Sequence, residues 1–399
     1  PGVNGTNFVS DVQIFNSSAS TANVTAIFTP SGADGTTNFA AVKLEIAPLQ
    51  VVALNDVVTA VMQTAGTGQL DFSGDVGNLI VSSRTYNSTS AGTFGQSIPS
   101  ISSDEAIGAG DLATVTLLRH NIDFRSNIGF AEVVGGSGTA RFTFLDSAGN
   151  TVGTTDYPVV PFTHFQTALL MDAIRADVTM IGNGRIAAYG SVVDNHSGDG
   201  MYIPAARAFA MERVVPAVHS PGLNGTFWRT DIWTTTGLTT TLQEDVVPAQ
   251  TLVPLFITAA IAGSRTWTTT DNGSCGEFIP VMPISGAMRA GESPLHLIGI
   301  EQSAARRTNI GVINVDRAAP VGIRITVYDG AGRERGRFDQ GIPPAQMFQI
   351  PLSAIAAGSL QNGRVTVEAF SAGGAAVAYA SVVDNRSGDS YVVIARKAR

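Results

Sequence analysis

Cysteine and charged side chains are scarce in this chain of 399 residues. Cys275 is the only cysteine, so neither an intrachain disulfide bond nor a zinc site built from several thiolates can form. Charged residues make up 14% of the chain and hydrophobic residues 44%, which excludes an acidic disordered protein. The 24 basic residues are scattered and the net charge is -8, which argues against a nucleic-acid partner.

Long apolar runs are missing too. The longest nearly apolar stretch, Thr251 to Gly263, is short and interrupted by threonine and proline, so we expect no membrane span. No basic segment followed by an apolar one precedes Pro1, so any signal peptide was removed or does not belong to this sequence.

Motifs that carry chemistry are also absent. The five histidines are His120, His164, His196, His219 and His296. They lie far apart, and the chain has no His-Glu-x-x-His, Gly-x-Ser-x-Gly or phosphate-binding glycine motif. Cys275 lies in an Asn-Gly-Ser-Cys-Gly segment, where we expect a residue of a turn rather than a nucleophile activated by a nearby base. We therefore predict a protein that is not an enzyme, with no catalytic residue, cofactor or metal. A pair of distant carboxylates, as in β-sandwich glycosidases, stays open.

Internal repetition is what the chain has instead. The nine residues from Ser191 to Asp199 match Ser381 to Asp389 at eight positions, with an offset of 190. The opening Pro-Gly-x-Asn-Gly-Thr returns at Pro221, and Ser83-Arg84-Thr85-Tyr86 returns as Ser264-Arg265-Thr266-Trp267. These pairs indicate a duplication of about 200 residues.

Each half divides again into two modules. Each module opens with a hydroxyl residue, then Asp or Asn, then a branched aliphatic residue, at Ser10, Ser126, Thr230 and Thr308. Alternation of period two at 23–30, 141–145 and 323–328, followed by turn residues, is typical of antiparallel strands. Only short helical turns are expected, within 51–64 and 352–357. We predict an all-β fold of four tandem immunoglobulin-like antiparallel β-sandwich modules: A (1–103), B (104–207), A′ (208–290) and B′ (291–399).

Module A′ is shorter than module A. The offset between them falls from 220 to 189 and then to 181, which removes 31 and then 8 residues, about 39 in all. The first gap removes the counterparts of 23–30 and 39–46, so a sheet edge and half a core would be exposed. We therefore expect the natural chain to be longer than 399 residues, with segments missing from A′ and before Pro1.

The Asp-Asn-x-Ser-Gly-Asp loops that close modules B and B′ allow two interpretations. Their oxygen-bearing residues are Asp194, Asn195, Asp199, Asp384, Asn385 and Asp389. Such oxygens are ligands for Ca²⁺, but the spacing differs from that of the Asp-x-Asp-x-Asp-Gly calcium loop. Asp, Asn, Ser and Gly are also the residues of turns, so we predict a hairpin turn with an Asx-type hydrogen bond and a left-handed Gly198.

Arginine and tryptophan supply the remaining candidate binding residues. Arg84 and Arg265 each lie beside an aromatic residue, where a guanidinium group and a ring can hold a carboxylate or a sugar. We favour the structural alternative, in which each arginine pairs with an acid of its own module or stacks on the neighbouring ring. Carbohydrate binding through Trp228, Trp233 and Trp267 needs an exposed row, and we expect at least two of them in a core.

The Pro-Gly-x-Asn-Gly-Thr opening, the Ser-Arg-Thr-Tyr hairpin and the Ser-Val-Val-Asp-Asn-x-Ser-Gly-Asp hairpin together resemble tandem immunoglobulin-like repeats of bacterial secreted and cell-surface proteins. The resemblance covers nearly the whole chain and transfers no catalytic or binding residue. It implies an extracellular or cell-surface location and a spacer, adhesive or assembly role, with self-association or other cell-surface proteins as partners.

The sequence therefore favours a non-catalytic structural protein: a rod of four sandwiches that acts as a surface appendage, a filament subunit or a spacer. In this hypothesis Tyr391, Val392, Val393 and Ile394 form a strand that fills a groove in module A of a neighbouring subunit. The alternative is an accessory region of a larger secreted enzyme, which binds carbohydrate or a partner.

Overall fold

The computed structural model describes residues 6–398 except 76, 78, 209–210, 235–238, 242–249, 259–261 and 272. The described part is all-β, with antiparallel sheets and only single helical turns, which confirms the all-β part of the predicted fold class. None of the helices found there has the length and apolar character needed to cross a membrane. The first five residues of the opening motif and the acidic run at 243–247 lie outside the described residues.

Module A consists of two sheets that enclose one hydrophobic core. Its elements are β1 (Phe8–Asn16), β2 (Ala22–Pro30), β3 (Ala40–Ile46), β4 (Val51–Leu54), η2 (Val57–Val61), β5 (Gly68–Gly74), β6 (Leu79–Thr89) and β7 (Gly92–Pro99). One sheet has the order β4-β1-β6-β7 and the other the order β3-β2-β5. Alternate residues of a strand point to one face, so Val12 and Ile14 of β1 meet Val24 and Phe28 of β2 in the core.

Modules B and B′ repeat each other strand for strand. The strands of module B are β8 (Leu112–Val115), β9 (Phe124–Glu132), β10 (Gly138–Leu145), β11 (Thr151–Val159), β12 (His164–Ala168), β13 (Arg175–Gly182), β14 (Ile186–Asp194), β15 (Gly200–Pro204) and β16 (Ala206–Arg207). The elements of module B′ are β24 (Leu295–Gln302), β25 (Arg306–Asn314), β26 (Val321–Tyr328), β27 (Glu334–Ile342), β28 (Met347–Pro351), η5 (Leu352–Ala354), β29 (Leu360–Ala369), β30 (Ala376–Asp384), β31 (Ser390–Ile394) and β32 (Arg396–Lys397).

Their sheets have the same strand order. The sheet β12-β9-β14-β15 of module B corresponds to β28-β25-β30-β31 of module B′, and β11-β10-β13-β8-β16 corresponds to β27-β26-β29-β24-β32. Each pair of sheets encloses a core, around Phe130 and Phe142 in module B and around Ile310 and Ile325 in module B′. The strands predicted at 23–30, 141–145 and 323–328 are confirmed as parts of β2, β10 and β26.

Module A′ departs from the predicted sandwich. Its elements are β17 (Arg213–Pro221), η3 (Leu223–Gly225), β18 (Phe227–Thr234), β19 (Thr239–Thr241), β20 (Thr251–Ile257), β21 (Ala262–Thr270), β22 (Gly273–Ile279), β23 (Met282–Pro283) and η4 (Ile284–Gly286). All the strands described in this module join one sheet, along the path β20-β17-β18-β21-β22. Val214 and Ile279 share a core with Ile313 and Tyr379 of module B′, while Trp233 joins the core of module B. Neighbouring modules therefore cover the apolar surface that the shorter sequence would leave exposed.

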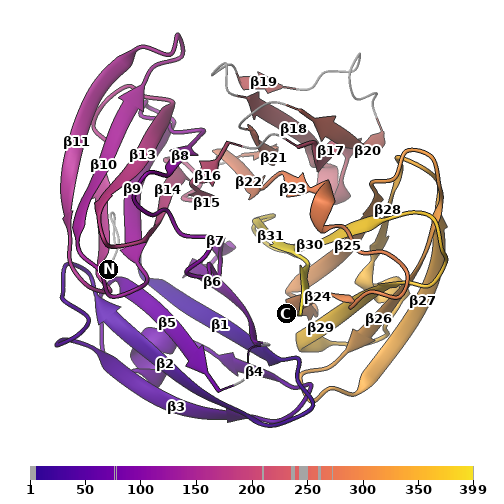
Figure 1. Ribbon diagram of the computed structural model, residues 1–399. Coiled ribbons are helices and arrows are strands. Elements are labelled where there is room, and N and C mark those ends of the chain that lie inside the picture. The colour runs from indigo at the N-terminus through magenta and orange to yellow at the C-terminus, as the bar shows by residue number, and fades with distance from the viewer. Residues whose placement is uncertain are drawn as a thin grey trace.

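The four modules close into a ring (Figure 1). One strand of each module lies toward the middle of the ring: β7, β15, β22 and β31. These four strands contact one another in cyclic order. Module A contacts module B′ directly: the Val51 N–H donates to the Gly330 carbonyl over 3.1 Å, and the rings of Phe15 and His296 lie 5.1 Å apart. The predicted rod is therefore wrong, because strands from opposite ends of the chain pack together.

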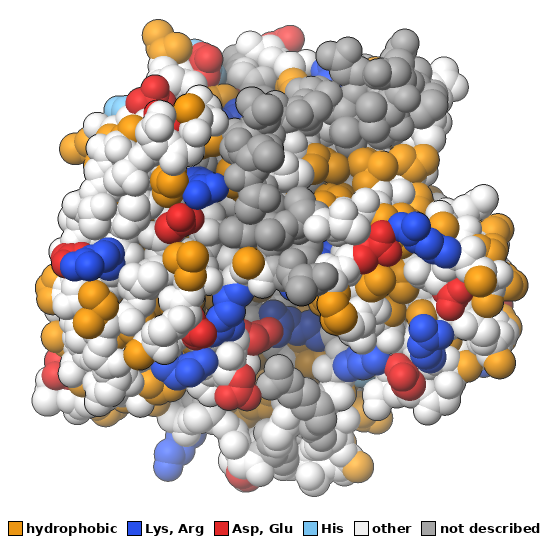
Figure 2. All heavy atoms as spheres, turned by 45° about the horizontal axis from the view of Figure 1, so that its top comes forward, with side chains coloured by type: hydrophobic (Ala, Val, Ile, Leu, Met, Phe, Trp, Pro, Cys, Tyr) orange, Lys and Arg blue, Asp and Glu red, His pale blue; other side chains and the backbone are white. Residues whose placement is uncertain are grey.

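The face of the ring drawn in Figure 2 carries acidic and basic side chains that are interspersed among polar and apolar ones. On this face the described residues gather into no extended surface of a single charge. The charged residues that connect the modules are buried near the place where β7, β15, β22 and β31 meet.

Candidate functional site

The two Asp-Asn-x-Ser-Gly-Asp loops are turns, as predicted. Asp194 Oδ1 accepts the N–H groups of His196 (2.8 Å) and Ser197 (2.9 Å), which is the expected Asx-type pattern. Gly198 has a φ of +77°, the left-handed conformation that favours glycine. The loop of module B′ repeats this geometry with Asp384, whose Oδ1 accepts two backbone N–H groups, and with Gly388, which also has a φ of +77°.

The second carboxylate oxygen of each loop binds the neighbouring module. Asp194 Oδ2 accepts the N–H (3.0 Å) and the hydroxyl (2.7 Å) of Ser274, in the β21–β22 hairpin of module A′. Asp384 Oδ2 accepts the N–H (3.1 Å) and the hydroxyl (2.9 Å) of Thr93, in the β6–β7 hairpin of module A. Burial raises the pKa of Asp194, but the donors of Ser197 and Ser274 outweigh it and hold that pKa below its usual range. These carboxylates are therefore parts of the module junctions.

The calcium interpretation of the loops finds no support. Asn195 Oδ1 accepts Arg125 Nη1 over 2.7 Å, and Asn385 Oδ1 accepts Arg307 Nη1 over 2.8 Å. Over the described ranges no three His, Cys, Asp or Glu side chains are grouped so that they could hold a metal ion. The loop oxygens are oriented by protein donors instead.

Asp199 and Asp389, the last residues of the two loops, form a fully buried pair of carboxyl groups. Asp199 is 2% exposed and Asp389 is 0% exposed. Burial, then the charge of Asp389 and a hydrogen bond with it, raise the pKa of Asp199 well above its usual range. Burial and the neighbouring carboxyl group both oppose the ionisation of this residue. The two halves of the chain thus meet through a buried pair of acids.

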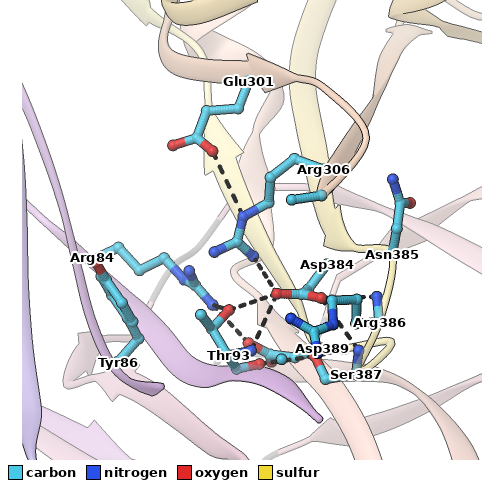
Figure 3. Close-up of polar contacts among 12 residues, drawn as sticks. Arg84, Tyr86, Thr93, Glu301, Arg306, Asp384, Asn385, Arg386, Ser387 and Asp389 are labelled. Carbon is cyan, nitrogen blue, oxygen red and sulfur yellow. Dashed lines mark hydrogen bonds and ion pairs between the residues drawn. The ribbon is translucent and has the colours of Figure 1, made fainter. Parts of the chain in front are cut away.

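Arg84 lies at the junction of module A with module B′ (Figure 3). Its guanidinium group is 4.8 Å from the ring centres of both Tyr86 and Tyr391, so the predicted stacking on the neighbouring ring is confirmed. Its Nη2 donates to Asp389 Oδ2 over 2.7 Å. The prediction of an acid from the same module is wrong, because Asp389 belongs to module B′. Arg265 stacks 5.6 Å from Trp267 and donates to Ser274 within its own module.

The other two junctions use polar residues that the sequence analysis did not select. Ser191 of module B donates to Gln96 Oε1 of module A over 3.0 Å. At the equivalent place Ser381 of module B′ donates to Glu277 Oε1 of module A′, also over 3.0 Å. Burial raises the pKa of Glu277 to about 8. The available signal was the repeat itself, since Gln96 and Glu277 occupy the same position of the two matching hairpins.

A serine–histidine pair lies between modules A and B. Ser31 Oγ is 2.5 Å from His164 Nδ1, and His164 Nε2 is 2.7 Å from the Tyr189 hydroxyl. Burial lowers the pKa of His164 to about 4. The N–H groups of Ser31 and Gly32 both donate to backbone carbonyls, so neither is free to stabilise an oxyanion. We interpret this contact as part of the A–B junction.

A polar cavity of about 140 Å³ lies beside Arg84, between modules A and B′. It is lined by Asp11, Gln13, Ser82, Ser83, Arg84, Tyr86, Glu301, Arg306 and Tyr391. Arg306 Nε is 3.5 Å from Glu301 and its Nη1 is 3.2 Å from Asp384, as the dashed lines in Figure 3 show. Two acids and two arginines thus surround a space that sequence reasoning had no means to find.

The three tryptophans do not form an exposed row. Trp233 is fully buried, which confirms a core position for this residue. Trp267 lies on the same face of the sheet as Trp233 and is half-buried, whereas Trp228 lies on the opposite face, because β18 alternates its side chains.

Two further expectations are corrected. Tyr391 to Ile394 belong to β31, which pairs with β30 from Tyr379 to Val383 and contacts β7 of module A, so the strand is not free for a neighbouring subunit. Cys275 does not lie in a turn: it is 1% exposed within β22, and burial raises the pKa of its thiol.

Replacing Gly273 by Ala tests the junction between modules B and A′. Gly273 has a φ of +114°, and a Cβ there would lie 2.7 Å from Asp194 Oδ1 and 2.9 Å from the His196 Cβ. Backbone strain and overpacking together should lower the free energy of unfolding by about 3 kcal/mol. The matched control is Gly198→Ala, at a φ of +77° with nothing within 4 Å, where strain alone should cost about 1 kcal/mol. Urea denaturation measures both, and equal losses would contradict a tight junction.

Comparison with known proteins identifies no family. No protein-family model and no curated protein matches the chain. Among solved structures, an allantoicase is similar over 80% of this chain and 77% of its own, at 8% identity and a TM-score of 0.18. An 11S allergen from Cocos nucifera covers 80% of both chains at 10% identity and a TM-score of 0.17. A Pleurotus ostreatus lectin covers 73% and 78% at 12% identity and a TM-score of 0.13. Likenesses this weak carry no argument about function.

Proposed function

We propose that this chain is a non-catalytic structural protein of the bacterial cell exterior, built from immunoglobulin-like modules. It serves as a compact unit of a surface appendage or filament, or as a spacer between other parts of a longer protein. Its partners in this role are further copies of the chain or other cell-surface proteins.

One observation carries the proposal: the repeated motifs are used to hold the modules together. Asp194 and Asp384 bind the hairpins of modules A′ and A, and Gln96 and Glu277 bind the serines of modules B and B′. Side chains that satisfy one another across a junction make a rigid body, because breaking any contact leaves a buried polar group unpaired. A rigid closed unit is what a spacer or filament requires.

Electron microscopy of the purified chain over a range of concentrations tests this role. We expect ring-shaped particles that join into ordered strings or arrays as the concentration rises, and sedimentation should show the same growth. The reference is the Gly273→Ala variant, whose particles should assemble less well because the unit is loosened. Particles that stay single at every concentration would contradict the assembly role.

The alternative is an accessory region of a secreted enzyme that binds carbohydrate through exposed tryptophans. The burial of Trp233 and the placement of Trp228 on the opposite face from Trp267 remove the continuous aromatic platform that this alternative needs. A glycan array on which Trp228→Ala and Trp267→Ala variants lose binding would restore it.

A further inference from the structure

The duplication creates two equivalent junctions, A with B′ and B with A′. Asp11 lies opposite Arg84 in the pairing of β1 with β6, and Asp231 lies opposite Arg265 in the pairing of β18 with β21. The loop contacts of Asp384 with Thr93 and of Asp194 with Ser274 are also equivalent. Strand register therefore shows which residue of one junction corresponds to which residue of the other.

The two junctions are lined by different side chains. The corresponding residues, A–B′ junction first, are Gln13 and Trp233, Tyr86 and Trp267, Ser82 and Gly263, Arg306 and Phe124, Tyr391 and Met201, and Glu301 and Arg119. At the B–A′ junction, Trp233 is fully buried and Met201 is 3% exposed. There Arg119 and Arg265 lie 4.6 Å and 5.3 Å from the Phe124 ring centre. Aromatic and apolar side chains thus occupy one junction, whereas the other encloses the polar cavity.

Several polar groups that line the cavity have hydrogen-bonding capacity left over. Gln13 is 8% exposed, and its amide makes no hydrogen bond to any part of the chain that the structure describes. The Ser82 hydroxyl likewise has no hydrogen-bond partner among the described residues. Arg306 Nη1 is buried without a hydrogen bond, and it lies 3.2 Å from Asp384 in an ion pair. The Gln13 amide and the Ser82 hydroxyl therefore face the cavity with donors and acceptors that an occupant can use.

The lining also indicates the charge and chemistry of the occupant. The charged groups of the lining already have partners: Arg84 pairs with Asp389, and Arg306 pairs with Glu301 and Asp384. Asp11 accepts the Asp56 N–H and the Tyr86 hydroxyl. A charged ligand would compete with one of these pairs, so a neutral ligand fits better. The lining offers both donors and acceptors, and the hydroxyl is the common neutral group that both donates and accepts.

The cavity has room for about one ring. A cavity of about 150 Å³ holds one benzene molecule, and this one measures about 140 Å³. Ser82 and Glu301 of its lining are half-buried, so outer hydroxyl groups of a larger molecule extend from the cavity toward solvent. We propose that the cavity between modules A and B′ binds one ring of a neutral, hydroxyl-rich molecule, a monosaccharide or a cyclitol. The hydroxyls of this ring bond to Gln13, Ser82, Glu301 and Arg306, and the site goes beyond the structural role of the junctions.

Calorimetric titration of the full chain with a panel of small molecules tests the proposal. The neutral probes are D-glucose, D-galactose, D-mannose, D-xylose and myo-inositol, and the charged comparators are D-glucuronate and glycine. We expect at least one neutral probe to bind one per chain, with a Kd between about 10 µM and 10 mM for a ligand of this size. No neutral binding at millimolar concentrations would show a cavity that holds water only, and tighter binding of a charged comparator would overturn the assignment of a neutral ligand.

Variants taken from the other junction locate the binding. Gln13→Trp places in the cavity the side chain that Trp233 supplies at the equivalent position, and should weaken binding at least about tenfold. Glu301→Gln keeps the shape of the lining and removes one charge-assisted acceptor, so it should also weaken binding even if Gln13→Trp fails to fold. The matched control is Arg119→Gln, at the position equivalent to Glu301 in the B–A′ junction, which should leave affinity unchanged. Binding that survives both cavity variants would overturn the proposal.

Discussion

Replacing Arg84 by Ala should lower the free energy of unfolding by about 3–5 kcal/mol, because it leaves a buried carboxylate without its cation. Arg84 and Asp389 form a 2.7 Å ion pair in which the two side chains are 8% and 0% exposed. The substitution also removes the stacking of the guanidinium group on Tyr86 and Tyr391. Urea denaturation followed by tryptophan fluorescence measures the loss.

The matched control for this prediction is an exposed ion pair. Arg141 and Asp156 lie 2.8 Å apart with side chains 46% and 45% exposed, so Arg141→Ala should cost less than about 1 kcal/mol. Replacing both Arg84 and Asp389 by Leu should recover most of the loss, since neither member of the ion pair is then left buried without the other. A loss below about 1 kcal/mol in Arg84→Ala would contradict the view that this pair closes the ring.

Replacing Glu277 by Gln should remove a large part of the pH dependence of stability. Burial raises the pKa of Glu277 from its usual 4.5 to about 8, so the folded state binds this proton more tightly than the unfolded state does. Stability from this group is fully present below pH 4.5 and falls as the pH rises toward about 8. At 1.36 kcal/mol per pKa unit, the variant should exceed the natural chain by at most about 5 kcal/mol at pH 9 and by little at pH 4.5. Denaturation at several pH values measures the difference.

The chain supplies its own control for this substitution. Gln96 occupies the equivalent position of module A and accepts the same kind of serine hydrogen bond over 3.0 Å, so a glutamine fits the site. The reciprocal change, Gln96→Glu, should introduce a fall in stability with rising pH, smaller because this position is only half-buried. A Glu277→Gln variant whose stability follows the natural profile at every pH would show that Glu277 ionises freely in the folded state.

Local patterns in the sequence predict the secondary structure of this protein well. The strand within 23–30 alternates buried and outward residues, and the Asp194 loop contains its own hydrogen-bond partners within three residues. The short helical segment expected within 51–64 is the single turn η2. In each case the residues that decide the conformation are neighbours in the chain, so the sequence displays the interaction directly.

Long-range closure could not be predicted in the same way. Arg84 binds an acid 305 residues away, and no periodicity or motif links two positions so far apart. Ring closure also involves the single sheet of module A′. The apolar face of this sheet packs on Ile313 and Tyr379 of module B′. The sequence predicted that the shorter module A′ would expose half a core, whereas in the structure modules B and B′ cover its apolar residues.

The polar cavity had a sequence signal of an unusual kind. Positions that agree between the two halves reveal the repeats, and the residues at those positions build the junctions. The cavity comes from positions that disagree, such as Gln13 against Trp233 and Tyr86 against Trp267. Recognising them required the strand register, because the offset between modules A and A′ changes along the chain.

Because the two halves are equivalent, it matters for amino-acid substitutions in the ring that they belong to one chain. Two separate copies of one A–B half, related by a two-fold axis, would make the same four junctions, and any substitution would then occur twice. Joining the halves in one chain removes that constraint, so a tryptophan can stand at 233 while a glutamine stands at 13. The B–A′ junction can therefore hold the ring closed with packed side chains, while the A–B′ junction contains a cavity.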